Sequence, residues 1–153
     1  MAIQFPKRPS LVGYVTCGDP NLETTRDVIF AAADAGVDVI ELGVPFSDPV
    51  ADGPVIQRAS ERALSSGTTL TKVLKLAREI RRQSKVGLVV FSYLNPVLRY
   101  GWERFCAEAE QAGVDGALIT DLPAEESQEY VRLMRRHNLA TVFLAAPTST
   151  DVR

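Results

Sequence analysis

The sequence lacks the features that would place it among nucleic-acid-binding, membrane or secreted proteins. Its formal net charge is −2 and its basic residues form no block or stripe, which argues against nucleic-acid binding. No apolar run approaches the ~20 residues of a membrane-spanning helix, and the N-terminus lacks the apolar core of a secretory signal. We therefore expect a cytoplasmic protein.

Cysteine and histidine are also scarce. Cys17 and Cys106 lie far apart and in no metal-ligand spacing, so we expect two reduced thiols and no metal site. The single histidine, His137, stands among basic residues near the predicted end of a helix, where the helix dipole favours a cation. That placement suits a helix-end histidine better than a catalytic base.

The glycine-rich motif of dinucleotide-binding folds is missing too. No G-x-G-x-x-G follows the first predicted strand, so a nicotinamide cofactor is not indicated. What the sequence does contain is an alternation of strand and helix patterns every ~30 residues, which is typical of parallel βαβ units. A single α/β domain covering residues 1–153, of the (β/α)8 barrel class, fits this alternation best.

Turn signals delimit the predicted elements. The predicted strands are 11–16, 39–43, 86–92, 116–120 and 140–145. The predicted helices are one that ends at Gly36, then 54–66, 71–83, 102–112 and 123–138. Val28, Ala32 and Ala35 recur at helical spacing and predict the buried face of the first helix. Residues 93–96 are expected to break the third strand, and 147–151 to cap a further helix.

A four-residue motif, Ala-Gly-Val-Asp, occurs twice, at 35–38 and 112–115. Each copy stands between a predicted helix and the strand that follows it. The motif is either a common helix-to-strand joint or the trace of an internal repeat, and the sequence leaves both interpretations open.

The second predicted strand and the loop after it carry three carboxylates. Glu41 interrupts a short apolar run, and the period of two places it on the same face as Val39 and Gly43. The loop that follows is stiffened by prolines and contains Asp48 and Asp52. One interpretation is structural, a strand-end ion pair followed by a solvated loop. The other is functional, because a buried carboxylate without a partner is costly and usually has a raised pKa.

Further acids and aromatic side chains stand at the C-terminal ends of the other predicted strands. In a barrel these ends meet on one rim, where the active sites of this fold lie. Each aromatic taken singly is better explained as core, but together they suit a flat aromatic substrate. Two acids of different burial beside it suit proton transfer. The set is Tyr14, Asp19, Glu41, Asp48, Asp52, Phe91, Tyr93, Asn95, Leu118 and Asp121.

Residues 41–57, ELGVPFSDPVADGPVIQ, resemble the signature of the tryptophan synthase α-subunit family. The segments YVTCGDP at 14–20, YLNP at 93–96 and DLPAEE at 121–126 resemble its other landmarks in the same order and spacing. The resemblance runs from about Leu11 onward and corresponds to the first five of the family's eight βα units. It implies an incomplete barrel of about five units.

The resemblance implies a lyase of tryptophan biosynthesis. In this family indole-3-glycerol phosphate is cleaved by a retro-aldol step to indole and glyceraldehyde 3-phosphate. Glu41 matches the acid–base catalyst, and Asp52 matches the carboxylate that stabilises positive charge at the indole N–H. The positions that match the indole-binding site are Tyr14, Phe91, Leu118 and, beside the Asp52 loop, Tyr93.

The resemblance also implies a partner. Indole passes through a tunnel to a β subunit in an α2β2 assembly, and pyridoxal phosphate belongs to that subunit, so no cofactor is expected in this chain. The positions that match the contact are Pro45, Asp48, Pro49, Asn95 and Pro123. The family's phosphate-binding loops follow the fifth unit, so we expect no cleavage by the 153-residue chain alone. The alternatives are a non-catalytic barrel fragment, a β-subunit-binding module or, more remotely, another phosphate-binding barrel.

Overall fold

A computed structural model describes residues 9–146 of the chain as five parallel strands in one sheet, with helices between them. The strands are β1 (Val12–Thr16), β2 (Val39–Gly43), β3 (Gly87–Ser92), β4 (Gly116–Ile119) and β5 (Ala140–Val142). The helices are α1 (Leu22–Asp34), α2 (Pro54–Ser65), α3 (Leu70–Arg81), α4 (Leu94–Tyr100), α5 (Trp102–Ala112), the short η1 (Ala124–Glu126) and α6 (Gln128–Arg136).

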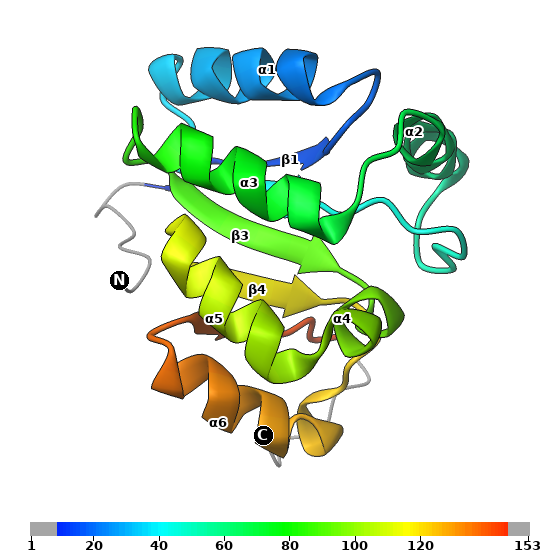
Figure 1. Ribbon diagram of the computed structural model, residues 1–153, viewed down its shortest axis with the longest axis vertical. Coiled ribbons are helices and arrows are strands. Elements are labelled where there is room, and N and C mark those ends of the chain that lie inside the picture. The colour runs from blue at the N-terminus through cyan, green and yellow to red at the C-terminus, as the bar shows by residue number, and fades with distance from the viewer. Residues whose placement is uncertain (1–8, 147–153) are drawn as a thin grey trace.

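The strand order is that of a barrel wall. The strands pair in chain order, β1-β2-β3-β4-β5, with no reversal. Helices α1, α3, α5 and α6 lie in a row over one face of the sheet (Figure 1). A doubly wound sheet reverses its strand order and carries helices on both faces, whereas a barrel advances in one direction with its helices outside. The arrangement confirms the predicted (β/α)8 barrel class, with five units among the described residues.

The two faces of the sheet are packed differently. Ile40 and Leu42 of β2 belong to the large hydrophobic cluster that the sheet shares with the helices. Val39 belongs to a small cluster on the opposite face, formed by strand residues alone. We call this opposite face the inner face. Its members confirm the predicted alternation along β2 and are Val39, Val89, Leu118, Phe91 and Val142.

The two Ala-Gly-Val-Asp segments form the same joint at the N-terminal ends of the strands. The backbone N–H of Asp38 donates to the carbonyl of Leu11 at 3.0 Å, and Asp38 Oδ2 accepts from Leu11 N at 2.9 Å. Asp115 makes the same pair of bonds with Leu88, at 2.9 and 2.8 Å. Each aspartate thus ties the start of its own strand to the strand before it. The motif is one joint built twice, and shared ancestry of the two copies stays a prediction.

The predicted buried face of the first helix is right at Ala32, which packs against the core, and wrong at Val28 and Ala35, which are exposed. Val28 is 50% exposed, whereas Ile29 and Thr25 are buried against the sheet. The apolar spacing that begins at Val28 is offset from the stripe that begins at Leu22, and the sheet selects the latter. In the helix predicted over 71–83, the apolar residues Val73, Leu76 and Ile80 recur at helical spacing and are all buried.

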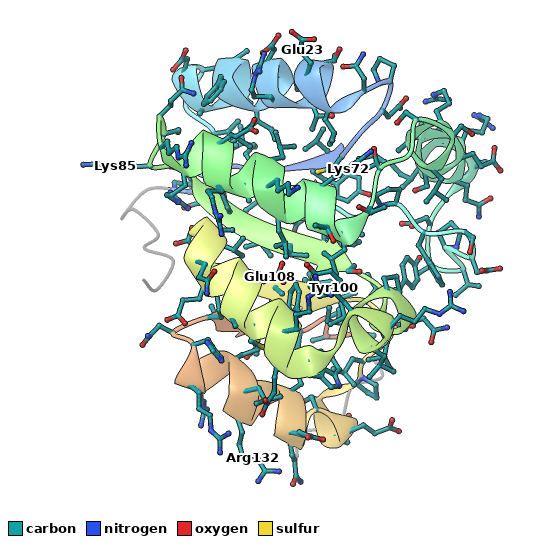
Figure 2. The ribbon with its side chains drawn as sticks, viewed as in Figure 1. Glu23, Lys72, Lys85, Tyr100, Glu108 and Arg132 are labelled. Carbon is teal, nitrogen blue, oxygen red and sulfur yellow. The ribbon has the colours of Figure 1, made fainter. Side chains whose placement is uncertain are left out.

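Helix α4 was not predicted. The strand ends at Ser92 as expected, but the helix begins at Leu94, within the segment that was expected only to break the strand. Pro96 lies in the first turn of this helix, where a missing N–H costs no hydrogen bond. Asp121 Oδ1 accepts from Leu94 N at 2.6 Å and so caps the helix from the loop after β4. At its other end, the Tyr100 hydroxyl donates to Glu108 of α5, and both side chains lie together in Figure 2.

The last predicted elements are shorter than expected. The helix expected over 123–138 is two pieces, η1 and α6, which meet at Ser127. Strand β5 covers Ala140–Val142 rather than 140–145, and the segment 147–151 lies outside the described residues.

Cys17 and Cys106 are both buried free thiols. Burial raises the pKa of the Cys17 thiol to about 12. None of the helices within residues 9–146 is long and apolar enough to cross a bilayer.

Candidate functional site

Strand register brings the predicted site residues into two adjacent rows on the inner face. Tyr14, Glu41 and Val89 are partners across β1, β2 and β3. The next inner row, nearer the C-terminal ends, contains Gly43 and Phe91 and continues into Leu118 of β4. Because the strands are parallel, register partners point to the same face. Glu41 therefore lies on the inner face beside Tyr14, and the row nearer the C-terminal ends carries Phe91 and Leu118. We call the side chains of Tyr14, Phe91 and Leu118 the strip.

The strip depends on the missing side chain of Gly43. A Cβ added at Gly43 would lie 2.4 Å from the hydroxyl oxygen of Tyr14, so the Tyr14 ring occupies the space above this glycine. From there it meets Phe91 edge-on, with ring centroids 5.1 Å apart and an interplanar angle of 76°. Tyr14 still has 36% of its surface exposed, which leaves a ring face open on the inner side. Burial raises the pKa of Tyr14 to about 12, so its hydroxyl stays protonated.

Glu41 is the acid that the surroundings tune. It is partly buried among apolar strand residues, and within residues 9–146 its carboxylate has no hydrogen bond or ion pair. Burial raises the pKa of Glu41 above its usual value. A carboxyl group with a raised pKa and free lone pairs is suited to both giving and taking a proton.

Asp52 is held by a tyrosine from the neighbouring strand end. The hydroxyl of Tyr93 donates to Asp52 Oδ2 at 3.1 Å and accepts from the backbone N–H of Ala51 at 2.9 Å. Tyr93 is only 3% exposed, and its ring lies 5.4 Å from that of Phe46. Tyr93 therefore fixes the loop after β2 to the end of β3. Glu41 and Asp52 are both partly buried, and they differ in their partners: Tyr93 donates to Asp52, whereas within residues 9–146 nothing donates to Glu41.

Two acids of the predicted set have structural partners. Asp19 forms a two-pronged ion pair with Arg62 of α2, both contacts at 2.7 Å. Asp121 caps α4 through Leu94. Neither is available in this structure as a free acid or base. Neither the role of Arg62 nor the contact between Gly43 and Tyr14 follows from the sequence, because both pairings join different βα units.

The residues expected at a partner contact differ in exposure. Asp48, Asn95 and Pro123 are exposed and Pro49 is partly exposed, all in loops at the C-terminal ends of the strands or at the start of α4. Val50, beside Pro49, has 85% of its surface exposed. Pro45 is buried, so its side chain is not available for a contact in this structure.

A cavity of about 750 Å³ lies at the opposite end of the sheet. Four of its ionisable groups form two pairs, Glu110 with His137 at 2.8 Å and Asp115 with Arg81 at 2.6 Å, and Arg135 also lines it. The pairing agrees with the predicted structural role of His137. Within residues 9–146 no three side chains of the metal-binding types come together. The inner face near Glu41 and Asp52, at the C-terminal strand ends, is therefore a better candidate for the active site than this cavity.

A family model described as "Tryptophan synthase alpha chain" matches residues 1–153. The tryptophan synthase alpha chain of Solibacter usitatus is 58% identical over 146 residues, which are 95% of this chain and 55% of that protein. The protein of the same name from Geobacter sulfurreducens is 51% identical over 151 residues, covering 99% of this chain and 57% of the relative. The chain thus spans a little over half the length of these relatives.

The solved structures that resemble this chain are also tryptophan synthase proteins. The tryptophan synthase subunit alpha of Legionella pneumophila str. Paris superimposes with a TM-score of 0.92 at 40% identity, over 95% of this chain and 56% of that one. A chain from the tryptophan synthase complex of Pyrococcus furiosus superimposes with a TM-score of 0.88 at 43% identity, over 93% of this chain and 58% of that one.

Proposed function

The chain belongs to the tryptophan synthase alpha chain family, and on that premise we propose that its site performs retro-aldol cleavage of indole-3-glycerol phosphate to indole and glyceraldehyde 3-phosphate. One observation carries the proposal. Glu41, an acid with a raised pKa and no hydrogen-bond partner within residues 9–146, is the register partner of Tyr14. The ring of Tyr14 meets that of Phe91 on the inner face, where a flat ring can contact both.

Glu41 is the proposed acid–base group. In its protonated form it gives a proton to C3 of the indole ring, which places positive charge on the ring nitrogen. In its ionised form it then takes the proton of the glycerol hydroxyl on the carbon attached to C3, as the carbon–carbon bond breaks. The bonding electrons return to the ring, the hydroxyl carbon becomes the aldehyde, and the proton count of Glu41 is restored. A group that must both give and take a proton works best with a pKa near the working pH.

Asp52 is the proposed electrostatic group. A carboxylate beside the ring nitrogen stabilises the positive charge that develops there, and it does so best when it is already held in place. The hydrogen bond from Tyr93 supplies that hold, because it fixes one oxygen of Asp52 and the adjacent backbone at Ala51. Tyr14, Phe91 and Leu118 would contact the ring itself. Tyr93 then acts on the loop rather than on the substrate.

We further propose a β subunit as the partner, in an α2β2 assembly, with indole as the molecule passed between them. The exposed residues at the C-terminal strand ends, Asp48, Pro49, Asn95 and Pro123, supply the contact surface, with Val50 as its apolar centre. A relative with this fold was solved in a tryptophan synthase complex. The proposed chemistry needs only proton transfer, so we assign no cofactor to this chain and pyridoxal phosphate to the partner. The proposed compartment is the cytoplasm, where the two free thiols stay reduced.

A second candidate is a binding module that docks on the β subunit without catalysis. The exposed apolar side chains of Val50 and Val55, beside the predicted contact residues, favour this candidate. It requires neither the raised pKa of Glu41 nor the hydrogen bond between Tyr93 and Asp52, and for that reason we prefer the lyase.

The test uses the 153-residue chain and a chimaera in which it is joined to the part of the Solibacter usitatus protein that lies beyond the match. A coupled assay for glyceraldehyde 3-phosphate measures cleavage. We expect activity in the chimaera and none in the chain alone, because phosphate sites in barrels come from the loops after strands 7 and 8. Glu41→Gln in the chimaera should lower kcat by ~10²–10⁴. Near-full activity of that variant would show that Glu41 is not the acid–base group.

Asp52→Asn, made in the same chimaera, separates the two candidate functions. The lyase requires a large loss of kcat, on the order of 10²-fold or more, because a charge that stabilises the transition state is gone. If the chain is only a binding module, the chimaera should bind a β subunit, and its cleavage rate should stay at background in every variant. A chimaera that binds the β subunit but never releases glyceraldehyde 3-phosphate would favour the binding module.

A further inference from the structure

Helix α2 differs from the other long helices in what attaches it to the sheet. Its buried side chains are all small, Ala59, Ser60 and Ala63. Among the described residues, neither hydrophobic cluster includes a member of α2, whereas α3 contributes six buried side chains to the large cluster. In Figure 1 α2 lies at the right-hand edge, apart from the row formed by α1, α3, α5 and α6. Because stabilisation by burial scales with apolar area, α2 gains little from it.

Polar contacts at the C-terminal half of α2 take the place of core packing. Arg62 Nε and Nη2 donate to the two carboxylate oxygens of Asp19, each at 2.7 Å, so the pair has the parallel two-pronged geometry that is strongest for arginine. One turn further on, the single hydroxyl proton of Ser66 is shared between the carbonyl of Ala63 at 2.8 Å and the carbonyl of Gly18 at 3.2 Å. Asp19 and Gly18 both belong to the turn after β1, so this turn is the anchor of α2. The guanidinium of Arg62 also lowers the pKa of Asp19.

Gly18 makes this anchor compact. Its φ of 92° is one that residues with side chains rarely adopt, and a Cβ there would lie 2.0 Å from Thr68 Oγ1. The turn after β1 therefore fits directly against the segment that follows α2. The far end of α2 is fixed through this fit and through the Asp19–Arg62 pair.

The near end of α2 carries Asp52. Gly53 is the N-cap residue of the helix, and Gln57 Nε2 donates to the carbonyl of Asp52 at 2.9 Å. Asp52 thus moves with the first turn of α2. Arg62 lies about 13 Å along the helix from Gly53, at 1.5 Å of rise per residue, so a tilt of about 5° about the anchored end displaces the first turn by about 1 Å.

We propose that Asp19 and Arg62 are positioning residues for Asp52: their ion pair sets the tilt of α2 and thereby the place of the carboxylate at its N-terminus. The chemical importance of that place rests on the function proposed above, but the mechanical link does not. Tyr93 fixes the loop from the side of β3, and the Asp19–Arg62 pair fixes it from the side of β1. With the pair removed, α2 loses its charge-assisted bond to the turn after β1, while the Tyr93 hydroxyl and the Gln57 side chain still hold Asp52.

Hydrogen–deuterium exchange on the 153-residue chain tests the mechanical link without any need for activity. The variants are Arg62→Ala and, as the matched control one turn away on the same exposed helix, Arg58→Ala. Peptides covering residues 46–57 report the loop and the first turn of α2, and a peptide from α3 reports overall folding. We expect Arg62→Ala to speed exchange in 46–57 by about threefold to fivefold, the effect of a well-formed surface ion pair, with α3 unchanged. Equal exchange in the two variants would overturn the proposal.

A charge reversal distinguishes loss of the ion pair from a general destabilisation of α2. Asp19→Arg combined with Arg62→Asp restores an ion pair in the opposite sense, so exchange in 46–57 should return toward that of the unmodified chain. Failure of the reversal to slow exchange relative to Arg62→Ala would show that the ion pair is not the cause.

The chimaera described above tests the consequence for chemistry. Arg62→Ala should lower kcat by about threefold to fivefold with little change in KM, because loss of a surface ion pair lowers the fraction of molecules with Asp52 in place by about the factor that speeds exchange. Arg58→Ala should retain both constants. Faster exchange in 46–57 with an unchanged kcat would refute the positioning role. A chimaera with no activity in any form would contradict the proposed function, and the exchange result would still decide the mechanical link.

Discussion

Tyr14 lies in the space that a side chain on Gly43 would need, since a Cβ there would be 2.4 Å from the Tyr14 hydroxyl oxygen. Gly43→Ala should therefore push the Tyr14 ring off β2 and out of its edge-on contact with Phe91. We expect a loss of about 1–3 kcal/mol in the free energy of unfolding, the usual cost of overpacking. Urea unfolding measures the loss, and near-ultraviolet circular dichroism reports the tyrosine environment.

Gly13→Ala is the matched control for that substitution. It lies on β1, and a Cβ there would meet nothing closer than 3.6 Å. Its effect should be small by comparison. Equal losses for Gly13→Ala and Gly43→Ala would mean that the ring of Tyr14 does not depend on the glycine beneath it.

Glu41→Gln should change the pH dependence of stability. Burial raises the pKa of Glu41, so the folded chain holds this proton more tightly than the unfolded chain does. The stability that the protonated group contributes is present below the unfolded pKa, about 4.5, and is lost as pH rises through the raised folded pKa. Glutamine does not titrate. The stability of Glu41→Gln relative to the unmodified chain should therefore increase from pH 4 to pH 7.

Urea unfolding at several pH values follows this difference directly. Glu61→Gln on the exposed side of α2 is the control, because it removes a carboxylate that lies in solvent. A stability difference for Glu41→Gln that stays constant from pH 4 to pH 7 would argue against a raised pKa at this position.

The two copies of the strand joint should differ in energetic weight. Asp115 is buried and accepts from both Leu88 N at 2.8 Å and Arg81 Nη2 at 2.6 Å. Asp38 accepts from Leu11 N in a more exposed setting. Asp115→Ala leaves a partly buried guanidinium without its partner, so we expect a loss of about 3 kcal/mol. Asp38→Ala should cost about 1 kcal/mol. Urea unfolding decides, and equal losses would refute the ranking.

Asp48 and Pro49 should matter for association with a β subunit. The loop is stiffened by prolines, so it loses little conformational entropy when it docks. We expect Asp48→Ala and Pro49→Ala to weaken binding of a β subunit by about tenfold each, measured by titration calorimetry with the chimaera. Asp34→Ala, an exposed acid at the end of α1, is the control for a general effect of charge. Unchanged affinity in both loop variants would remove the loop from the contact.

The sequence predicted what depends on local period. The alternation along β2 placed Glu41 on the inner face beside Val39 and Gly43, and the strand has the predicted bounds. The bounds predicted for 102–112 are likewise those of α5, which Gly113 ends in the left-handed conformation. In these segments neighbouring residues alone determine both the structure and the face that is buried.

What the sequence could not provide are the contacts between different units. Helix α4 needs a cap from Asp121, which lies on the loop after another strand, so Pro96 alone suggested only a break. The face of α1 is chosen by the sheet, and two overlapping apolar spacings gave no basis for choosing Ile29 over Val28. The Asp19–Arg62 pair joins the turn after β1 to α2, and nothing in the spacing of these residues indicates it.

The repeated joint has a consequence for how this architecture can diverge. Asp38 and Asp115 both align their strands at the N-terminal end, whereas the loop that carries Asp52 lies at the C-terminal end. Insertions or deletions in the loops at the other end would leave that alignment untouched, so strand register would survive while the rim acquires new lengths and new side chains. The two ends of each strand can therefore evolve at separate rates. The N-terminal end is constrained by strand register, and the C-terminal end by the chemistry of the site.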